Sequence, residues 1–258
     1  MNKSQLNHLI HWFDRYVEPF LDTDEEGAKN IRLKIEHTRK VCEAMALLSS
    51  GENLSENDLY IASAVALLHD VGRFPQYQRW RTFRDSESDN HARMAINVIL
   101  DEQILAGIEL SEQLLIEEAV RFHNLLVPPA GIKSPTRRFI NLIRDADKLD
   151  IWRIFAELLA EPPEERASAV TLGLPDLPEM VSDTCVAALN SRTVVRLDST
   201  TCFNDFKLLQ ISWVYDLNSA TSRRILLERG YIPALAATLP ERPDIREAVA
   251  KALDSLSA

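Results

Sequence analysis

Apolar residues recur at the spacing of an α-helix along most of this chain, and this periodicity limits its fold more than any other feature. The stripes predict helices at about 6–17, 25–48, 55–72, 91–105, 111–124, 136–159, 181–190, 204–217, 219–229 and 244–255. Only Thr193–Leu197 has the pattern of a strand, and it is isolated. The seven glycines lie mostly between these segments, which argues against a glycine-rich barrel or a dinucleotide-binding unit. We therefore predict an all-α fold.

The best candidate for a boundary is the segment 161–179, which contains four of the twelve prolines. We predict one all-helical domain over residues 1–258, with a core at about 30–160 and a C-terminal helical extension at about 180–258. Within the core, Arg73–Asn90 has neither a helical stripe nor a strand pattern and is predicted to be a loop.

Composition excludes several classes of protein. With 46% hydrophobic and 26% charged residues, the chain is typical of globular proteins rather than disordered ones. Its net charge of −10 disfavours nucleic-acid binding, and an anionic substrate would need a local basic cluster or a metal ion. Three cysteines without a CxxC pair argue against a disulfide scaffold or a cysteine zinc site. We expect a cytoplasmic protein without a signal peptide or membrane span, and a homo-oligomer is compatible with the sequence.

Histidines and aspartates stand out on the predicted helices. The pair His69-Asp70 ends a helix so apolar that it must be buried, where a carboxylate is costly unless a charge such as a divalent cation compensates it. His37 lies on another mostly apolar helix, and Asp147 lies in a long helix with three aspartates in six residues. We expect Asp147 to face inward, whereas Asp145 or Asp150 can face solvent. These residues together predict a metal site.

The order His37, His69-Asp70, Asp147 resembles the HD superfamily of metal-dependent phosphohydrolases, and the phrases LLHDVGR (67–73) and DADKLD (145–150) carry the resemblance. It covers about residues 30–155. It implies a bundle of about five helices with one metal ion held by a histidine, the HD pair and the distal aspartate. His91 and His123 resemble the additional histidines of members with a second metal or a histidine-lined phosphate site. A dinuclear centre is left open.

Arginines and aromatic residues alternate after the HD pair, with no acidic residue before Asp85. In an acidic chain this is a local reversal of charge, and guanidinium groups suit bidentate phosphate recognition. We predict that Arg73, one turn after His69, contacts substrate. For Arg79, Arg81 and Arg84, substrate contact and structural salt bridges are equally open. The full set of candidate substrate-binding residues is Arg73, Arg79, Arg81, Arg84 and Lys148.

These features favour hydrolysis of a phosphate ester or anhydride in a small molecule, with nucleotides among the candidates. The metal ligands would be His37, His69, Asp70 and Asp147, and the catalytic residues Asp70, Arg73, His91 and His123. Mixed imidazole and carboxylate ligands favour Mn, Fe, Co, Ni or Zn over Mg. Two alternatives stay open. The ligand order also resembles HD-type di-iron oxygenases, and a non-catalytic ligand sensor could retain the metal.

Overall fold

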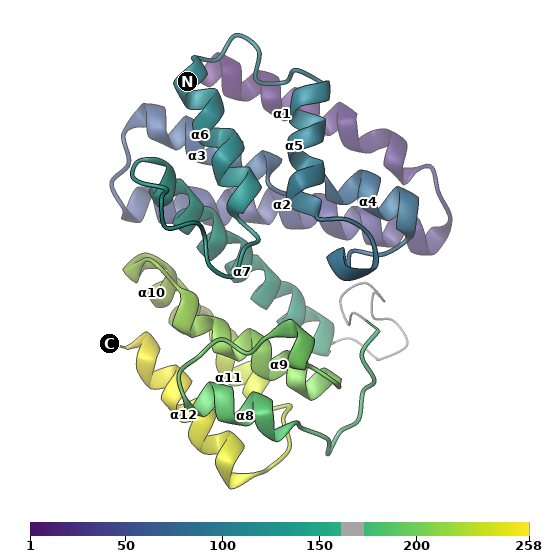
Figure 1. Ribbon diagram of the computed structural model, residues 1–258, viewed down its shortest axis with the longest axis vertical. Helices are drawn as coiled ribbons and strands as arrows, with labels where there is room; N and C mark the ends of the chain where they lie inside the picture. The colour runs from purple at the N-terminus through teal and green to yellow at the C-terminus, as the bar shows by residue number, and fades with distance from the viewer. Residues whose placement is uncertain (161–172, 258) are drawn as a thin grey trace. The chain divides into compact units, whose positions relative to one another are not determined.

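The computed structural model describes residues 1–160 and 173–257, and the regular elements in these ranges are all helical (Figure 1). The predicted all-α fold is therefore confirmed. The chain divides into two compact units, unit 1 (Met1–Asp150) and unit 2 (Ile151–Ala258), and the division falls within the long helix α7 (Thr136–Ala160). The predicted boundary segment, 161–179, lies largely outside the described residues, and the single-domain description stays a prediction.

Unit 1 is built around a buried apolar helix, α3. Residues Ala64–Leu68 of this helix are all buried, as the apolar run predicts, and α3 packs against α1, α2 and α6. Helix α5 packs against both α4 and α6. The helices of unit 1 are α1 (Lys3–Val17), α2 (Glu25–Gly51), α3 (Glu56–Leu68), α4 (Arg73–Trp80), α5 (His91–Asp101), α6 (Leu110–Phe122) and the first part of α7, with 3-10 turns at Glu18–Leu21 and Asp85–Glu87.

Side-chain caps fix where these helices begin. The Ser55 hydroxyl accepts from the Asp58 amide at the start of α3 and satisfies an amide that has no intrahelical partner. Asn90 does the same for α5 through the Arg93 amide. The N-cap of α6 is Glu109, because a carboxylate can also accept from the free amides of a first turn.

The predicted loop after the HD pair contains a helix, α4. Its sequence hides this because Pro75 suggests a break, yet a proline in the first turn removes only an amide that has no intrahelical partner. Gly72, at the N-cap of α4, lies against α5: a Cβ there would come within 2.2 Å of the His91 carbonyl oxygen. This close approach brings the HD turn and the start of α5 together.

Unit 2 is organised around α9, in which every residue is buried. The remaining helices pack on α9 or on one another, with α8 against both α9 and α12. The predicted strand at Thr193–Leu197 is wrong: Thr193–Arg196 has no regular structure, because no second strand among the described residues pairs with it. The amides of Thr193 and Val195 donate instead to the Ala188 carbonyl and the Ser212 hydroxyl. The helices that follow α7 in unit 2 are α8 (Asp183–Asn190), α9 (Phe203–Ser212), α10 (Ala220–Arg229), α11 (Tyr231–Ala236) and α12 (Pro243–Leu256), with 3-10 turns at Leu197–Ser199 and Trp213–Asp216.

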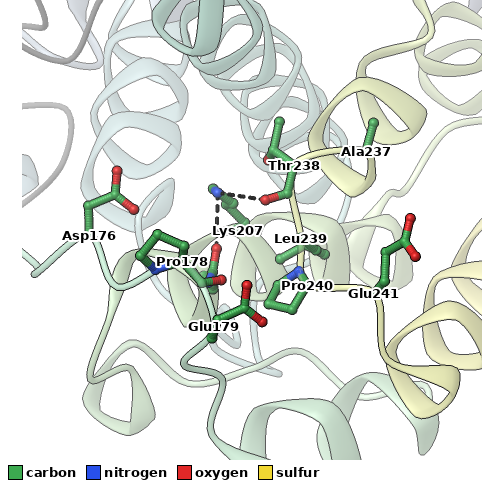
Figure 2. Close-up of a pocket in the computed structure, with 10 residues that line it drawn as sticks. Asp176, Pro178, Glu179, Lys207, Ala237, Thr238, Leu239, Pro240 and Glu241 are labelled. Carbon is green, nitrogen blue, oxygen red and sulfur yellow. Dashed lines mark hydrogen bonds between the residues drawn. The ribbon is translucent and has the colours of Figure 1, made fainter.

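A hollow of about 340 Å³ in unit 2 lies beside α9 (Figure 2). The Lys207 ammonium lies at this hollow and donates to the Asn204 side-chain oxygen (3.0 Å) and to the Thr238 carbonyl (3.2 Å). The Asn204 amide in turn donates to three backbone carbonyls between Leu177 and Met180. Polar side chains of α9 thus hold two irregular segments of unit 2 in place.

Among the described residues, no helix has both the length and the apolar composition needed to cross a membrane.

Candidate metal centre

The ends of several helices deliver buried imidazoles to one place in unit 1. His69 is the C-cap of α3, His123 is the C-cap of α6, and His91 is the first residue of α5. His37 comes from within α2 and lies on its buried face. All four imidazoles are at most 5% exposed, as is Asp70, which follows His69. The structure therefore brings together four histidines that are far apart in the sequence.

Two of these imidazoles are anchored by their own helices. The Nδ1 of His69 lies 2.7 Å from the Ala66 carbonyl oxygen, and the Nδ1 of His123 lies 2.7 Å from that of Val120. Carbonyls in the last turn of a helix have no intrahelical partner, so a histidine at the C-cap can donate to one of them. Because a carbonyl only accepts, Nδ1 carries the proton and Nε2 presents a lone pair.

The other two imidazoles are anchored by carboxylates. His37 Nδ1 lies 2.7 Å from Asp150 Oδ2, and His91 Nδ1 lies 2.7 Å from Asp85 Oδ2. A histidine that ligates a metal typically donates its other ring N–H to a carboxylate or carbonyl, which fixes its tautomer and orientation. All four histidines have this arrangement.

Asp70 lies between the two pairs of imidazoles. Its Oδ2 is 3.6 Å from His37 Nε2 and 3.8 Å from His69 Nε2, and its Oδ1 is 3.7 Å from His91 Nε2. Two groups of potential ligands therefore share Asp70: one with His37 and His69, and one with His91 and His123. Asp70 could therefore offer a ligand oxygen to each group.

The chemistry of the donor atoms fits a cation. The Nε2 atoms of His37 and His69 are buried and have no hydrogen-bond partner. The Nε2 atoms of His91 and His123 lie 3.1 Å apart. With both Nδ1 atoms donating elsewhere, these are two lone pairs facing each other, which only a proton or a cation between them makes favourable. These residues fit one divalent metal ion, and they offer ligands for a second.

Asp147 lies beside the first group of potential ligands. Its Oδ1 lies 3.1 Å from His37 Nε2 and 3.9 Å from His69 Nε2. The expectation that Asp145 or Asp150 faces solvent is wrong, because both are at most 2% exposed. Asp150 lies one turn after Asp147 and holds the opposite side of the His37 ring.

Electrostatics keep Asp70, His91 and His123 in the protonation states that a metal requires. Burial raises the pKa of Asp70, but Lys34, His69 and Arg73 together outweigh it and hold that pKa well below its ordinary value. Burial lowers the pKa of His91 to about 4, with help from the Arg73 charge, and it lowers the pKa of His123 to about 4 as well. At neutral pH the carboxylate is ionised and both imidazoles are neutral.

Asp85, which holds His91, is itself held by a network of polar side chains. The Gln76 amide donates to Asp85 Oδ1 (2.9 Å), to the Ser88 hydroxyl and to the Asp89 carbonyl. Burial raises the pKa of Asp85, but its bond to His91 and the charge of Arg73 bring that pKa down to about 2. The segment after α4 is thereby attached to the start of α5.

Of the four arginines predicted to bind substrate, Arg73 is the one that the structure brings to these imidazoles. Its Nε lies 3.3 Å from Asp70 Oδ1, its Nη1 lies 3.0 Å from Asp85 Oδ1, and its Nη2 lies 3.4 Å from His91 Nε2. Helix α3 ends before Gly72, so Arg73 reaches the site from the first turn of α4 rather than by continuing the helix of His69.

The other predicted substrate-binding residues have different surroundings. Arg79 stacks over the Trp80 ring, with its guanidinium carbon 4.5 Å from the ring centre. Arg81 pairs with Asp24, and Arg84 pairs with Glu87. Lys148 is buried, with its Nζ 3.5 Å from the Arg144 carbonyl oxygen. Substrate binding by these four residues stays a prediction.

Sequence reasoning missed several residues that complete the site, namely Lys34, Gln76, Asp85 and Asp150. Lys34 Nζ lies 2.9 Å from Asp70 Oδ2. The position of Lys34 one turn before His37 is the single signal that could have indicated its role, because residues three apart share a helix face. Gln76 and Asp85 lie in the segment predicted to be a loop, where periodicity gives no direction to a side chain.

Comparison with known proteins adds the family. The HD domain model matches residues 35–167, which is more than half of the chain, and this range includes His37, the His69-Asp70 pair and Asp147. Neither the curated proteins nor the solved structures gave a match. The ordered ligands, their convergence in a helical unit and the extent of this match lead to one conclusion: the chain belongs to the HD domain family, within the superfamily of metal-dependent phosphohydrolases.

Proposed function

We propose that this protein hydrolyses a phosphate ester or anhydride in a small molecule, with nucleotides among the candidate substrates. The observation that supports this most is the position of Asp70 between two pairs of imidazoles whose Nε2 atoms turn inward. A carboxylate shared by two groups of nitrogen ligands suits a centre that must polarise a phosphoryl oxygen and activate water.

His37, His69, Asp70 and Asp147 would hold the first ion, and Asp70, His91 and His123 offer ligands for a second. Mixed nitrogen and oxygen ligands favour Mn, Fe, Co, Ni or Zn over Mg. When bound, such an ion supplies Lewis-acid activation of water and of a phosphoryl oxygen. The lone pairs on His91 and His123 favour a cation over direct contact with phosphate, because neutral acceptors do not bind phosphate oxygens.

The remaining residues of the site orient the imidazole rings or neutralise negative charge on the substrate. Asp150 and Asp85 fix the rings of His37 and His91, so the Nε2 atoms are aimed before any ligand arrives. Arg73 can offset negative charge on the non-bridging oxygens, since its guanidinium group is beside both Asp70 and His91. Burial of Asp70 and the imidazoles excludes bulk water, which strengthens each of these interactions.

The test is a phosphate-release screen of the purified chain, stripped of metal and reloaded with each candidate ion in turn. We expect hydrolysis of a phosphorylated small molecule with at least one transition metal, and loss of both metal and hydrolysis in Asp70→Asn and His69→Ala. Lys40→Met is the matched control, because Lys40 is an exposed residue of α2 paired with Glu43. Normal metal content and turnover in both ligand variants would contradict the assignment.

An oxygenase is the second candidate, because two groups of ligands that share a carboxylate also suit a di-iron centre. The same preparation loaded with iron distinguishes the two activities. Oxygen uptake with a redox-active di-iron spectrum, and no phosphate release, would favour the oxygenase.

A further inference from the structure

Lys34 contacts the same carboxylate that the imidazoles surround. Its Nζ lies 2.9 Å from Asp70 Oδ2 and 5.4 Å from the centre of the Phe83 ring. Lys34 is one turn before His37 on α2, so both side chains lie on one face of that helix. The side chain of Lys34 is 17% exposed and that of Asp70 is 5% exposed. The ammonium is therefore the more accessible of the two groups.

The cations are distributed over both oxygens of Asp70. Lys34 lies beside Oδ2, the oxygen that faces His37 and His69, and Arg73 Nε lies 3.3 Å from Oδ1, the oxygen that faces His91. Each oxygen of Asp70 thus has one cationic side chain within 3.3 Å. A group that binds at Asp70 meets both an ammonium and a guanidinium.

The balance of charge indicates what that group is. Asp70 can compensate Lys34 and Arg73 only while its own charge is not shared with metal ions. Once it is a ligand, Lys34 needs another anion, whereas Arg73 keeps its ion pair with Asp85. The terminal phosphate of a monoester is dianionic near neutral pH and has three non-bridging oxygens, which is enough for a metal and both cations. A phosphodiester has a single negative charge and two such oxygens.

Building on the proposed function, we infer that Lys34 is a specificity-determining residue that binds a non-bridging oxygen of a terminal phosphate opposite Arg73, so that the protein selects phosphomonoesters over phosphodiesters. A lysine suits this exchange of partners, because its ammonium is a point charge on a flexible stem and can move from a carboxylate to an incoming phosphate. The Phe83 ring beside the ammonium limits that movement.

A purely structural Lys34 would behave differently. If its role were only to position Asp70, replacing it would disturb the metal ligands and lower the metal content. If it binds phosphate, metal content stays the same and affinity for phosphate falls. These outcomes are measured separately, so the two roles are distinguishable.

The first experiment titrates the metal-loaded full chain with inorganic phosphate in a calorimeter, together with metal analysis of every sample. We expect Lys34→Met to keep its metal and to bind phosphate about tenfold to a hundredfold more weakly, as loss of one charge-assisted contact implies. Lys34→Arg should retain part of the affinity. The control Lys40→Met should match the wild type, since Lys40 is exposed and paired with Glu43.

The second experiment compares para-nitrophenyl phosphate with bis(para-nitrophenyl) phosphate. We expect the wild type to favour the monoester, and Lys34→Met to lose most of that preference through a higher KM for the monoester alone. Unchanged phosphate affinity in Lys34→Met, loss of its metal, absence of phosphate binding by the wild type, or a wild-type preference for the diester would each overturn the inference.

Failure of the proposed function looks different from these outcomes. A wild type that binds phosphate through Lys34 yet hydrolyses no phosphorylated compound would contradict hydrolysis and still support Lys34 as a phosphate-binding residue.

Discussion

Both units of this protein bury polar side chains, but they satisfy them in different ways. In unit 2, Asp205 accepts from the backbone amides and hydroxyls of Ser182 and Thr201 and so holds two segments to α9. In unit 1, the inward Nε2 atoms of His37 and His69 have no hydrogen-bond partner, and they converge on Asp70. Buried polar groups that bond to backbone stabilise a fold, whereas buried groups that converge without partners are arranged for a ligand.

One buried residue of unit 2, Gln210, departs from this contrast. Gln210 in unit 2 is fully buried, and neither of its side-chain amide atoms has a partner. It differs from the imidazoles because, among the described residues, no group of potential metal ligands was found in unit 2. Convergence of several unpartnered atoms, rather than one unpartnered group, is therefore what marks the site.

The sharpest way to break this comparison is to remove a ligand and a neighbour from the same helix. We expect Asp147→Ala to lose its metal and nearly all hydrolysis, because Asp147 approaches both His37 and His69. Asp145→Ala is the matched variant: two residues correspond to about 200° around a helix, so Asp145 cannot face the same ion. Asp145→Ala should weaken metal binding without abolishing it. Metal analysis and phosphate release check both variants, and loss of metal from Asp145→Ala alone would show the register to be wrong.

Replacing Arg73 tests whether one residue of unit 1 both binds substrate and stabilises the structure. We expect Arg73→Ala to lower kcat/KM about tenfold to a hundredfold, because one charged phosphate contact contributes about 1.5–3 kcal/mol. The first metal should stay bound, since the substitution leaves its proposed ligands His37, His69, Asp70 and Asp147 in place. Arg73→Lys should recover part of the rate. Normal kcat/KM with a lower melting temperature would make Arg73 a structural residue.

The converse experiment removes a buried polar group from unit 2. We expect Asp205→Ala to destabilise the protein by about 1–3 kcal/mol, because the Ser182 and Thr201 amides lose a buried acceptor. Metal content and turnover at low temperature should match the wild type, which thermal unfolding and the phosphate-release assay would show. A variant as stable as the wild type but inactive would remove the distinction between the two units.

Acidification of the metal-free protein should give the smallest of the expected effects, a pH-dependent loss of folding stability. The pKa of His123 is about 4 in the folded protein because burial lowers it, so the unfolded chain binds more protons than the folded one between that value and about 6.5. Stability therefore falls as the pH is lowered through this window. We expect the wild type to lose about 1–2 kcal/mol more than His123→Asn between about pH 7 and pH 5.

Comparison with His123→Asn is needed because His37 shifts in the other direction. Burial lowers the pKa of His37, but the Asp147 and Asp150 carboxylates beside its two ring nitrogens outweigh burial and raise that pKa, so the contribution of His37 to stability has the opposite sign. Chemical denaturation at each pH gives the difference between the two proteins. Equal losses in both would show that His123 is not neutral and buried in solution.

The sequence by itself determined the helical class and indicated candidate ligands at helix positions with a clear register. Helical spacing assigns each residue to a face, which gives directions to the apolar run before His69 and to Asp147. The burial of Asp145 and Asp150 does not follow from that spacing. The tertiary structure decided which residues outside the periodic pattern take part in the site. Asp85 and Gln76 act from a segment without a stripe, and Lys34 and Asp150 matter only because α2 and α7 bring them to Asp70 and His37. A one-dimensional pattern records which face a residue occupies, whereas the partner on the other side of that face is set by packing between helices.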